Sequence, residues 1–378
     1  MSISKTHIPS NNINSSKRIP AIDGLRAIAV VGVIWVHTWD FSGNPVWSIG
    51  KIGSINLDLN RAISVIGTGV DLFFVLSGFC MYLKYAHKQQ SFKINYYWYF
   101  VKKCWLRIAP AFYIAAIVCA IGHIFLGLSF HWQDLLSHFT FTNIWWSNTN
   151  KLAPPFWSLS TQWSFYLILP LLILAIYKSG FKRVAIIAII CSIVFRLWMY
   201  SSSLDIQYFW GRQLPSRLGE FILGMGIARL YVLKKSLPKI LKYEQGFLIG
   251  FIMTYIGRIL MVTELVKMSG SVGFIFQTLA HPVVSLGYSI ILWNVISSES
   301  IFQKLLSHQL FQVIGRWSYS LYLWHYWLSF LIVEYLVNSF GESTIILNAS
   351  LFISLVILIP ISWWSYYYLE TPYFRWKK

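Results

Sequence analysis

The chain has 378 residues, of which 56% are hydrophobic, 18% aromatic and only 12% charged. Soluble globular proteins carry about 25% charged residues, so this composition excludes soluble, disordered, fibrous and disulfide-scaffold proteins and indicates a polytopic membrane protein. The formal net charge of +18 at pH 7 does not indicate a nucleic-acid partner, because the cations lie between apolar segments rather than along one continuous face.

The two ends of the chain are polar and enclose a single long apolar region. Residues 1–17 are rich in Ser and Asn, and no small-residue cleavage site follows the first apolar stretch, so we expect no removed signal peptide. We predict a cytoplasmic segment at 1–19, one transmembrane domain at 20–370 and a cytoplasmic tail at 371–378. The four cysteines form no metal-binding or redox motif and are expected to pack as thiols: Cys80, Cys104, Cys119 and Cys191.

Ten apolar segments of about 20 residues are each long enough to cross a bilayer core of roughly 30 Å as a helix. They run at 20–39, 62–83, 109–129, 160–178, 184–201, 214–233, 246–262, 272–296, 317–338 and 344–368. Most Lys and Arg residues fall between them on one side, which places both termini in the cytoplasm. We therefore predict an all-α membrane bundle of about ten helices. Ahead of the third segment, residues 91–108 mix aromatic and basic side chains, which predicts an interfacial helix on the cytoplasmic leaflet.

The first segment carries two ionisable residues, Arg26 and His37. Their separation of eleven residues is about 20° from three full helical turns, so both side chains are predicted to share one face, roughly 16 Å apart. Ionisable groups in a membrane helix are costly and usually face an internal cavity, which makes both residues functional candidates. The alternative is a histidine satisfied by a neighbouring aromatic residue and an arginine that snorkels to lipid phosphate.

The second segment carries Asp71 and Ser77 among bulky apolar side chains. An intramembrane carboxylate needs a partner, and we expect Asp71 to pair with His37 or Arg26 on the first segment. A structural and a catalytic role are equally open for Asp71. Ser77, which precedes Gly78, is expected to act in helix packing rather than as a nucleophile.

A polar and aromatic group lies at the external start of the fourth segment and suits sugar hydroxyls, although an aromatic belt has the same composition. It comprises Trp157, Ser158, Ser160, Gln162 and Tyr166. The ninth segment carries Tyr322 and a second buried imidazole, His325. The remaining histidines show no partner pattern and are interpreted as loop, interfacial or packing residues: His7, His87, His123, His131, His138, His281 and His308.

Several familiar catalytic motifs are missing from the sequence. It has no glycine-rich phosphate loop, no zinc-type His and Glu spacing and no nucleophile elbow. We therefore expect no bound metal and no permanently bound cofactor. A nucleotide-like ligand would have to be held by Lys and Arg side chains at the cytoplasmic rim.

These residues resemble acyltransferase family 3, the ten-span membrane enzymes that move acetyl groups from cytoplasmic acetyl-CoA onto cell-surface sugars. The most specific match is the spacing of Arg26 and His37 inside AIDGLRAIAVVGVIWVH. The resemblance covers nearly the whole chain, from Arg18 to Pro372. The further matches are FFVLSGF, the basic stretch ending at Arg107 and Pro110, WSLS at Trp157, RLGEFILGM with Arg217 and Glu220, SYSLYLWH ending at His325, and LETPYF with Glu370.

Three features depart from the family pattern. The first of two arginines usually found before the third segment is replaced by Cys104, which leaves Lys102 and Lys103 as substitutes beside Arg107. The acidic residue typical after the WSLS motif is Gln162, so a carboxylate role is absent there or has moved. The extracellular hydrolase-like domain of some members is missing, so we expect the enzyme to complete the transfer itself or to hand the group to another protein.

The resemblance implies that acetyl-CoA, the acyl donor, enters from the cytoplasm. Its phosphates would be held by Arg26, Lys103 and Arg107, since arginine suits bidentate phosphate contact. His37 would act as general base on an acceptor hydroxyl, with Asp71 to orient it. The enzyme class implied is an O-acetyltransferase.

The acceptor implied is a hydroxyl of a surface polysaccharide or lipid-linked glycan, such as lipopolysaccharide O-antigen, capsule or exopolysaccharide, at the bacterial inner membrane. Direct transfer is the simpler scheme, and a covalent acyl intermediate on Ser77 or Tyr322 is the alternative. The sequence leaves the acceptor sugar and the oligomeric state open. The residues expected to bind the acceptor are Trp157, Ser160, Gln162, Tyr166, Arg217, Glu220, Tyr322 and His325.

Two other classes of function fit part of the same pattern. A transporter or flippase of a glycan or acyl carrier would use Arg26, His37 and Asp71 as an ion or proton relay, and the composition and topology fit it equally well. A non-catalytic scaffold in a glycan-assembly complex explains the buried ionisable residues poorly. The order of the motifs favours the enzyme.

Overall fold

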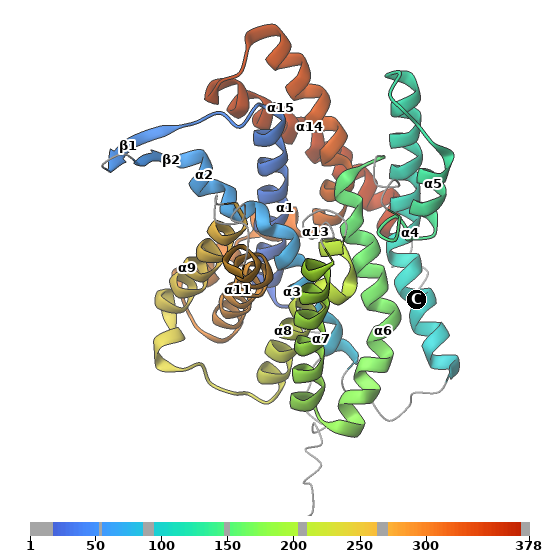
Figure 1. The fold of residues 1–378 in the computed structure, drawn as a ribbon, viewed down its shortest axis with the longest axis vertical. Helices are drawn as coiled ribbons and strands as arrows, with labels where there is room; N and C mark the ends of the chain where they lie inside the picture. The colour runs from blue at the N-terminus through green and yellow to red at the C-terminus, as the bar shows by residue number, and fades with distance from the viewer. Residues whose placement is uncertain are drawn as a thin grey trace, which may run out of the picture.

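The protein is described here by a computed structural model, in which residues 18–52, 55–85, 94–146, 152–202, 210–262 and 271–371 are placed. They form a helical bundle (Figure 1). Of the predicted terminal segments, only Arg18, Ile19 and Thr371 lie among the described residues. The elements are α1 (Pro20–Phe41), β1 (Ser48–Ile52), β2 (Ile55–Asp58), α2 (Leu59–Ile63), η1 (Ser64–Thr68), α3 (Gly69–Tyr85), α4 (Ile94–Phe125), α5 (Trp132–Phe139), η3 (Pro154–Phe156), α6 (Trp157–Ser179), α7 (Phe181–Ser201), η4 (Trp210–Arg212), α8 (Leu214–Val232), η5 (Lys239–Leu241), α9 (Tyr243–Val262), α11 (Ser271–Ser297), α12 (Ile301–Leu306), α13 (Gln309–Arg316), α14 (Ser318–Phe340), α15 (Thr344–Ser365) and the π-helical η6 (Tyr366–Glu370).

Each of the ten predicted segments lies on one of the long helices, namely α1, α3, α4, α6, α7, α8, α9, α11, α14 and α15. Within the described ranges, six helices are long and apolar enough to cross a membrane: those built on α1, α3, α4, α6, α11 and α15. The fold class is therefore all-α with several candidate membrane spans. The count of ten spans and the cytoplasmic termini stay predictions.

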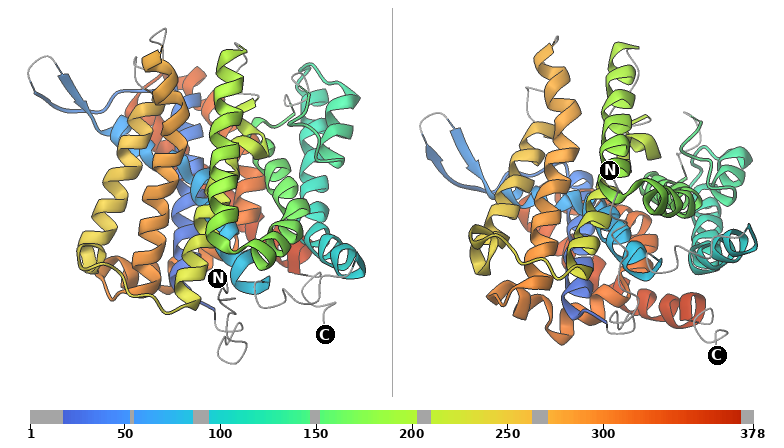
Figure 2. Two further views of the ribbon diagram at one scale, coloured as in Figure 1. Left: turned by 60° about the horizontal axis from the view of Figure 1, so that its bottom comes forward. Right: turned by 90° about the horizontal axis from the view of Figure 1, so that it is seen from below.

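The first helix, α1, runs through the middle of the bundle (Figures 1 and 2). Pro20 at its first turn fits the helix N-terminus, where the missing N–H costs nothing, and Asp23 complements the positive end of the helix dipole. Most of its side chains are buried, and it packs against α3, α13, α14 and α15. A residue on α1 can therefore face several helices that are distant in the sequence.

The helices α3 and α8 approach each other closely near the centre of the bundle. A Cβ atom on Gly78 would collide with the backbone carbonyl of Phe221, and a Cβ atom on Gly224 would collide with the backbone carbonyl of Val75. Only glycine allows the two backbones to approach this closely, as in other small-residue contacts between membrane helices. This contact fixes α8 beside α3 and so determines which polar residues of the two helices meet.

One predicted feature of the chain, the interfacial helix, needs correction. Residues 91–108 were expected to form an interfacial helix separate from a span that begins at 109, but α4 is continuous from Ile94 to Phe125. Pro110 lies inside this helix, and a proline bends a helix without necessarily ending it when its flanks are helical. The first half of α4 still exposes large aromatic side chains, including Trp98 and Tyr99.

A small β-hairpin was not predicted. The strands β1 and β2 pair antiparallel and project from the bundle beyond the end of α1 (Figure 1). Asp58 ends the hairpin and caps α2, because its carboxylate accepts from the backbone N–H groups of Trp47 and Asn60, both at 3.0 Å. The hairpin is short and lies outside the helical bundle, so it leaves the all-α class unchanged.

Candidate active site

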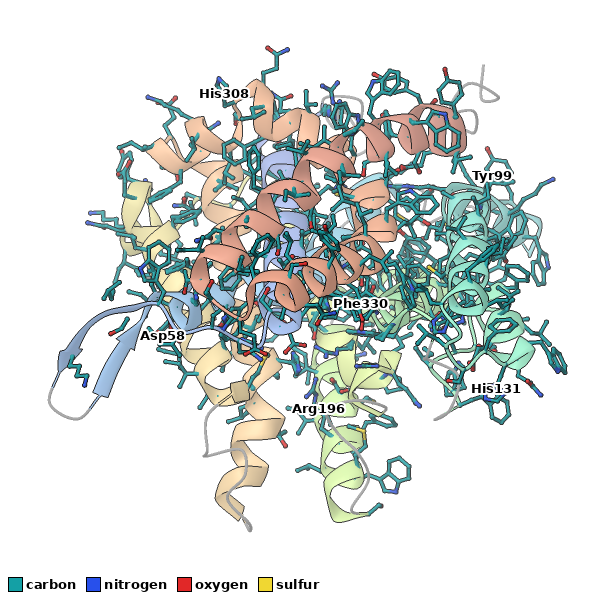
Figure 3. The ribbon with its side chains drawn as sticks, turned by 90° about the horizontal axis from the view of Figure 1, so that it is seen from above. Asp58, Tyr99, His131, Arg196, His308 and Phe330 are labelled. Atoms are coloured by element: carbon teal, nitrogen blue, oxygen red, sulfur yellow. The ribbon has the colours of Figure 1, made fainter. Side chains whose placement is uncertain are left out.

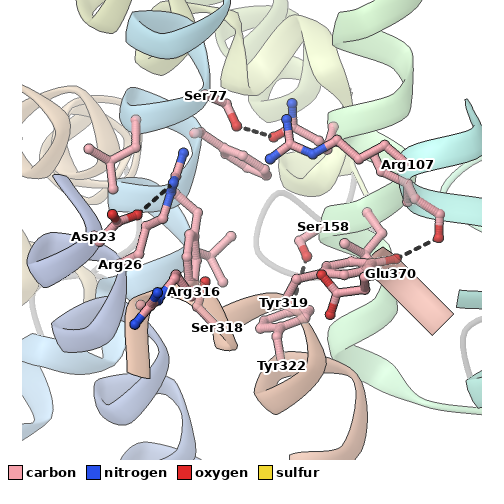
Figure 4. A pocket seen from close by; sticks show the side chains of 18 of the residues that line it. Asp23, Arg26, Ser77, Arg107, Ser158, Arg316, Ser318, Tyr319, Tyr322 and Glu370 are labelled. Carbon is pink, nitrogen blue, oxygen red and sulfur yellow. Dashed lines mark hydrogen bonds and ion pairs between the residues drawn. The ribbon is translucent and has the colours of Figure 1, made fainter. Parts of the chain in front are cut away.

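A cavity of about 260 Å³ lies between α1, α3, α4, α6, the α13–α14 junction and η6. Its lining includes four arginines against two carboxylates (Figure 4). The arginines are Arg18, Arg26, Arg107 and Arg316, and the carboxylates are Asp23 and Glu370. An excess of guanidinium groups around an open cavity is a binding environment for phosphate or carboxylate. In the predicted orientation this cavity lies at the cytoplasmic end of the bundle.

Asp23 organises the arginines on the α1 side of the cavity. Its Oδ2 accepts from Arg18 Nε at 2.5 Å, and its Oδ1 accepts from Arg26 Nη1 at 3.1 Å. The Asp23 carboxylate is 4% exposed, whereas the Arg26 side chain is 27% exposed. The buried carboxylate therefore orients two guanidinium groups that still reach the cavity. Asp23 is a site residue that sequence reasoning missed, although it lies one turn before Arg26.

On the opposite wall, α4 contributes Arg107 rather than Lys103. Arg107 is exposed and lines the cavity, and Figure 4 shows it across the cavity from Arg26. Lys103 does not line the cavity, because its Nζ lies over the ring of Tyr99 on the same helix, 5.2 Å from the ring centroid. Lys103 was expected to bind a donor phosphate, but it lies outside this cavity.

The inner end of the cavity is polar but uncharged. Ser77 Oγ donates to Gln162 Oε1 at 2.8 Å, and Tyr166 lines the same region. The Nε2 group of Gln162 is buried and has no hydrogen-bond partner among the described residues. Ser77 thus fixes the orientation of an amide that retains an unused donor. The helix-packing role expected for Ser77 stays a prediction, and the structure adds this hydrogen bond to Gln162.

Tyr322 closes the cavity at its inner end. Its hydroxyl donates to the carbonyl oxygen of Pro155 at 2.6 Å and lies 2.7 Å from Ser158 Oγ. Its ring packs against His325, with ring centroids 5.4 Å apart. Tyr322 lines the cavity and His325 does not, so this tyrosine separates the cavity from the imidazoles behind it.

The structure brings the two candidate imidazoles together. His37 and His325 have ring centroids 5.1 Å apart, and His325 Nε2 lies 3.4 Å from His37 Nδ1. His37 Nδ1 also lies 2.9 Å from the carbonyl oxygen of Val33, and His325 Nδ1 lies 2.7 Å from that of Tyr322. A carbonyl only accepts, so each neutral ring carries its proton on Nδ1. His37 Nε2 is then left as a lone pair available to take a proton.

His37 does not face lipid alone, because Phe41 and Tyr326 also pack against its ring. The cavity that contains Arg26 does not extend to it, however. A single open path from Arg26 to His37 was expected. The cavity instead runs from Arg26 to Tyr322 and stops there. A ligand in the cavity would reach the imidazoles only past that side chain.

Asp71 pairs with partners other than those predicted. Its Oδ1 lies 3.2 Å from Arg217 Nη1 and 2.7 Å from His281 Nδ1, whereas a contact with His37 or Arg26 was expected. The reason is helix packing: α3 lies against α8 and α11 at this level, so Asp71 faces those helices. The relay of Arg26, His37 and Asp71 required by the transporter hypothesis is therefore not assembled.

Arg217 is the centre of this buried ion cluster. Its Nη1 donates to Asp71 Oδ1 at 3.2 Å and to Glu220 Oε1 at 3.0 Å, and it lies 2.6 Å from His281 Nδ1. Asp71, Glu220 and His281 hold their ligand atoms close enough for a metal ion, but the guanidinium nitrogen lies among all three and supplies the positive charge they require. His281 was interpreted as a packing residue, and its only sequence signal was an imidazole in an apolar segment.

Trp157 links the ion cluster to the cavity. Arg217 lies over its ring at 5.2 Å from the centroid, and Phe74, which lines the cavity, packs against the same ring edge-on. Cation–π contacts of a buried arginine contribute to its fixed orientation. The structure therefore places Trp157, Arg217 and Glu220 in one network behind the cavity wall, and none of the three lines the cavity.

Ser160 belongs to a separate buried network. It donates to Asn143 Oδ1, Asn143 Nδ2 donates to His138 Nε2 at 3.5 Å, and His138 Nδ1 donates to the carbonyl oxygen of Asp134 at 2.6 Å. Burial lowers the pKa of His138, on the short helix α5 outside the membrane-spanning segments, to about 4. Ser160 is fully buried and does not line the cavity, so this position favours a structural role.

Glu370 is a second site residue outside the predicted set. It ends the π-helical η6, lines the cavity and accepts a hydrogen bond from Ser320. Single π-helical turns occur frequently at functional sites. The LETPYF match was the sequence signal for this position.

The site as a whole is a cationic cavity that ends near a pair of imidazoles in a bundle of apolar helices. The chain belongs to acyltransferase family 3, whose acyltransferase domain matches residues 19–367.

The relatives that it matches are O-acetyltransferases by name. It is 27% identical to the peptidoglycan O-acetyltransferase OatA of Listeria monocytogenes, over 82% of this chain and 49% of that protein. It is 24% identical to the O-acetyltransferase OatA of Staphylococcus aureus, over 95% of this chain and 57% of that protein. The chain thus spans about half the length of the curated relatives it matches. No solved structure matches it.

Proposed function

We propose that this protein is a membrane O-acetyltransferase that transfers an acetyl group from cytoplasmic acetyl-CoA to a hydroxyl of a cell-envelope glycan. The observation that carries the proposal is the cavity with four arginines around its walls and Tyr322 at its inner end, with two imidazoles packed behind that tyrosine. Family membership and the names of the relatives support the reaction class.

The donor would bind with its phosphates at the arginines and its acyl end at Tyr322. Arg26 and Arg107 lie on opposite walls of the cavity (Figure 4), so they would grip the diphosphate from two sides. The narrow, mainly apolar pantetheine arm would extend past Phe73 and Phe74, which line the cavity. The thioester carbonyl would then lie near Gln162, whose unused amide donor suits an oxygen that gains negative charge during acyl transfer.

His37 would act as the general base of the transfer. The acceptor oxygen attacks the thioester carbon, His37 Nε2 takes the acceptor proton, the carbon–sulfur bond breaks, and coenzyme A leaves as a thiolate that is protonated on release. A positioned base of this kind contributes about 100- to 10,000-fold. His325 fixes the His37 ring through the Nε2 to Nδ1 contact at 3.4 Å.

Tyr322 must move or carry the acyl group for the two substrates to meet. Its side chain separates the cavity from His325, and its hydroxyl is engaged by Ser158 and the Pro155 carbonyl. Direct transfer needs only a rotation of this side chain. The covalent alternative needs an acetyl-tyrosine and predicts a labelled peptide from α14.

A test is to incubate purified protein, reconstituted in lipid vesicles, with radiolabelled acetyl-CoA and isolated cell-envelope glycan. We expect release of free coenzyme A and label on the glycan that base treatment removes as acetate. A transporter would leave acetyl-CoA intact, and that result would overturn the proposal. Mass spectrometry of envelope glycans from cells with and without the protein would identify the acceptor sugar.

A further inference from the structure

A second cavity, of about 200 Å³, lies on the other side of the bundle between α7, α8 and α11. The helices α7 and α11 both pack on α8 and contact one another only slightly, which leaves a crevice with α8 as its floor. Within the described ranges, it shares no lining residue with the arginine-lined cavity. The lateral crevice, as we call it, is therefore a separate site that the proposed acyl transfer does not use.

The walls of the lateral crevice are apolar. They include Ile189 and Ile193 of α7, Leu223 of α8, and Leu279 and Leu286 of α11. The outer faces of the two wall helices also expose large aliphatic side chains, among them Ile190 and Val194, both of which are more than half exposed. In a membrane such surfaces contact lipid, so an occupant of the crevice would enter from the hydrocarbon phase and fill it with apolar groups.

The floor of the lateral crevice holds a polar group that lacks partners. Ser216 Oγ and Glu220 Oε2 are both buried, and neither has a hydrogen-bond partner in the part of the chain that the structure describes. Both residues line the crevice and are 3% exposed. A buried polar atom without a partner is destabilising, so two such atoms on one wall indicate that a bound group satisfies them.

Arg196 completes this polar floor. It is 2% exposed, lines the crevice and donates through Nε and Nη2 to the backbone oxygen of Ser216, at 3.1 and 2.9 Å. Figure 3 marks its position on α7. Glu220 uses its other oxygen, Oε1, for Arg217. The arginine thus holds the first turn of α8 in place, and the Ser216 hydroxyl and the Glu220 Oε2 atom remain for a ligand.

The unused atoms specify the chemistry of that ligand. Glu220 Oε2 accepts a hydrogen bond when the carboxyl is ionised and donates one when it is protonated, so a hydroxyl suits it in both states. Ser216 can donate or accept. A hydrocarbon chain alone would leave both atoms unpaired, and a free sugar would place its hydroxyls against the aliphatic walls. A headgroup with hydroxyls can pair with both atoms, and a hydrocarbon chain attached to it can pack against the apolar walls.

We propose that the lateral crevice binds a membrane amphiphile, with its hydrocarbon chain between α7 and α11 and a hydroxyl-bearing headgroup hydrogen-bonded to Glu220 and Ser216. An alkyl or prenyl glycoside is the simplest ligand of this class. The binding does not depend on the acyl-transfer proposal, since its residues lie outside the arginine-lined cavity.

The chain offers a matched pair of variants for a test. A Cβ atom on Gly219, which lines the crevice, and a Cβ atom on Gly122 of α4 would each meet no other atom within 4 Å. Gly219→Leu would therefore fill the crevice without a collision, and Gly122→Leu would add the same side chain elsewhere. Leucine is also a better helix former than glycine, so both variants are expected to fold.

The probe is octyl glucoside with a diazirine on its chain, added to the full protein in phosphatidylcholine nanodiscs and activated by light. We expect labelled peptides from α7 and α11, loss of this label in Gly219→Leu, and unchanged label in Gly122→Leu. Excess octyl glucoside should remove the label, whereas octyl phosphocholine, which has no hydroxyl, should not.

Three results would overturn the proposal: equal labelling of Gly219→Leu and wild type, equal competition by octyl phosphocholine, or uniform labelling of all lipid-facing helices. Circular dichroism of each variant checks that it is folded. If Gly219→Leu is unfolded, the labelling of Gly219→Val replaces it. The competition experiments on the wild-type protein then test the proposal as before.

Discussion

Two groups of charged residues in this protein differ in how their charges are balanced. In the arginine-lined cavity, Arg107 is exposed and Arg26 is partly exposed, with more guanidinium groups than carboxylates around them. In the ion cluster, Arg217 is buried against Asp71 and Glu220. Charges that remain accessible and in excess can bind an anion, while charges that are paired and buried mainly hold helices together. The difference assigns anion binding to the first group and helix positioning to the ion pairs of the second.

The largest effect on activity is expected at His37. His37→Ala should lower the rate of acetyl transfer by about 100- to 10,000-fold, because it removes the proposed base, and it should leave the protein folded. The measurement is coenzyme A release by purified protein. His131→Ala is the matched control, since His131 is exposed before α5 and makes no side-chain cap. Full activity of His37→Ala would refute the role of this imidazole.

The largest effect on stability is expected at Arg217. Arg217→Gln leaves Asp71 and Glu220 buried without their shared cation, and loss of one partner from a buried ion pair costs about 3–5 kcal/mol. We expect a lower unfolding temperature in detergent and poor accumulation in the membrane. Arg316→Gln, at an exposed position on the cavity wall, should change the unfolding free energy by only about 0.5 kcal/mol. Equal stability of the two variants would contradict the claim that the ion cluster holds helices together and the arginines of the cavity do not.

The next largest effect is expected on the KM for acetyl-CoA. Arg107→Gln should raise the KM for acetyl-CoA by about 10- to 100-fold, because hydrogen bonds to charged groups contribute about 1.5–3 kcal/mol. Lys103→Gln on the same helix should leave the KM unchanged, since Lys103 lies over Tyr99 and not at the cavity. Steady-state kinetics at several acetyl-CoA concentrations separate KM from kcat. The reverse pattern, with Lys103 dominant, would contradict the placement of the donor.

The smallest effect is a pH dependence outside the membrane-spanning helices. The pKa of His138 is lowered to about 4 from the ordinary value of about 6.5, so the unfolded chain binds a proton between these values while the native protein does not. Stability should therefore fall as the pH is lowered from about 6.5 to about 4. His138→Gln should flatten this dependence in thermal unfolding, with His131→Gln as control. An unchanged slope would show that His138 does not titrate in this way.

The sequence predicted individual residues better than it predicted their partners. The apolar segments placed helices at all ten expected positions, because a long apolar run has few alternatives to a helix in a membrane. Asp71 was singled out correctly as a buried charge, but its pairing with His281, 210 residues away, depends on how α3 and α11 pack. Periodicity within one helix contains no information on which helix lies beside it.

The site residues that were missed lie at the ends of elements. Asp23 is in the first turn of α1, Arg316 ends α13, and Glu370 ends η6. Polar residues at helix ends are common and ordinarily face solvent, so their type gave no signal of a shared cavity. The meeting of His37 with His325 was also outside the reach of the sequence, since each imidazole had been considered alone.

The most direct test of the central claim is photo-crosslinking of the purified protein with an acyl-CoA analogue that carries a diazirine in its acyl chain. The account predicts label on peptides around Tyr322 in α14 and Ser158 in α6, which line the inner end of the arginine-lined cavity, and loss of this label with excess acetyl-CoA or in Arg107→Gln. Label at α9, or label that acetyl-CoA does not displace, would contradict it.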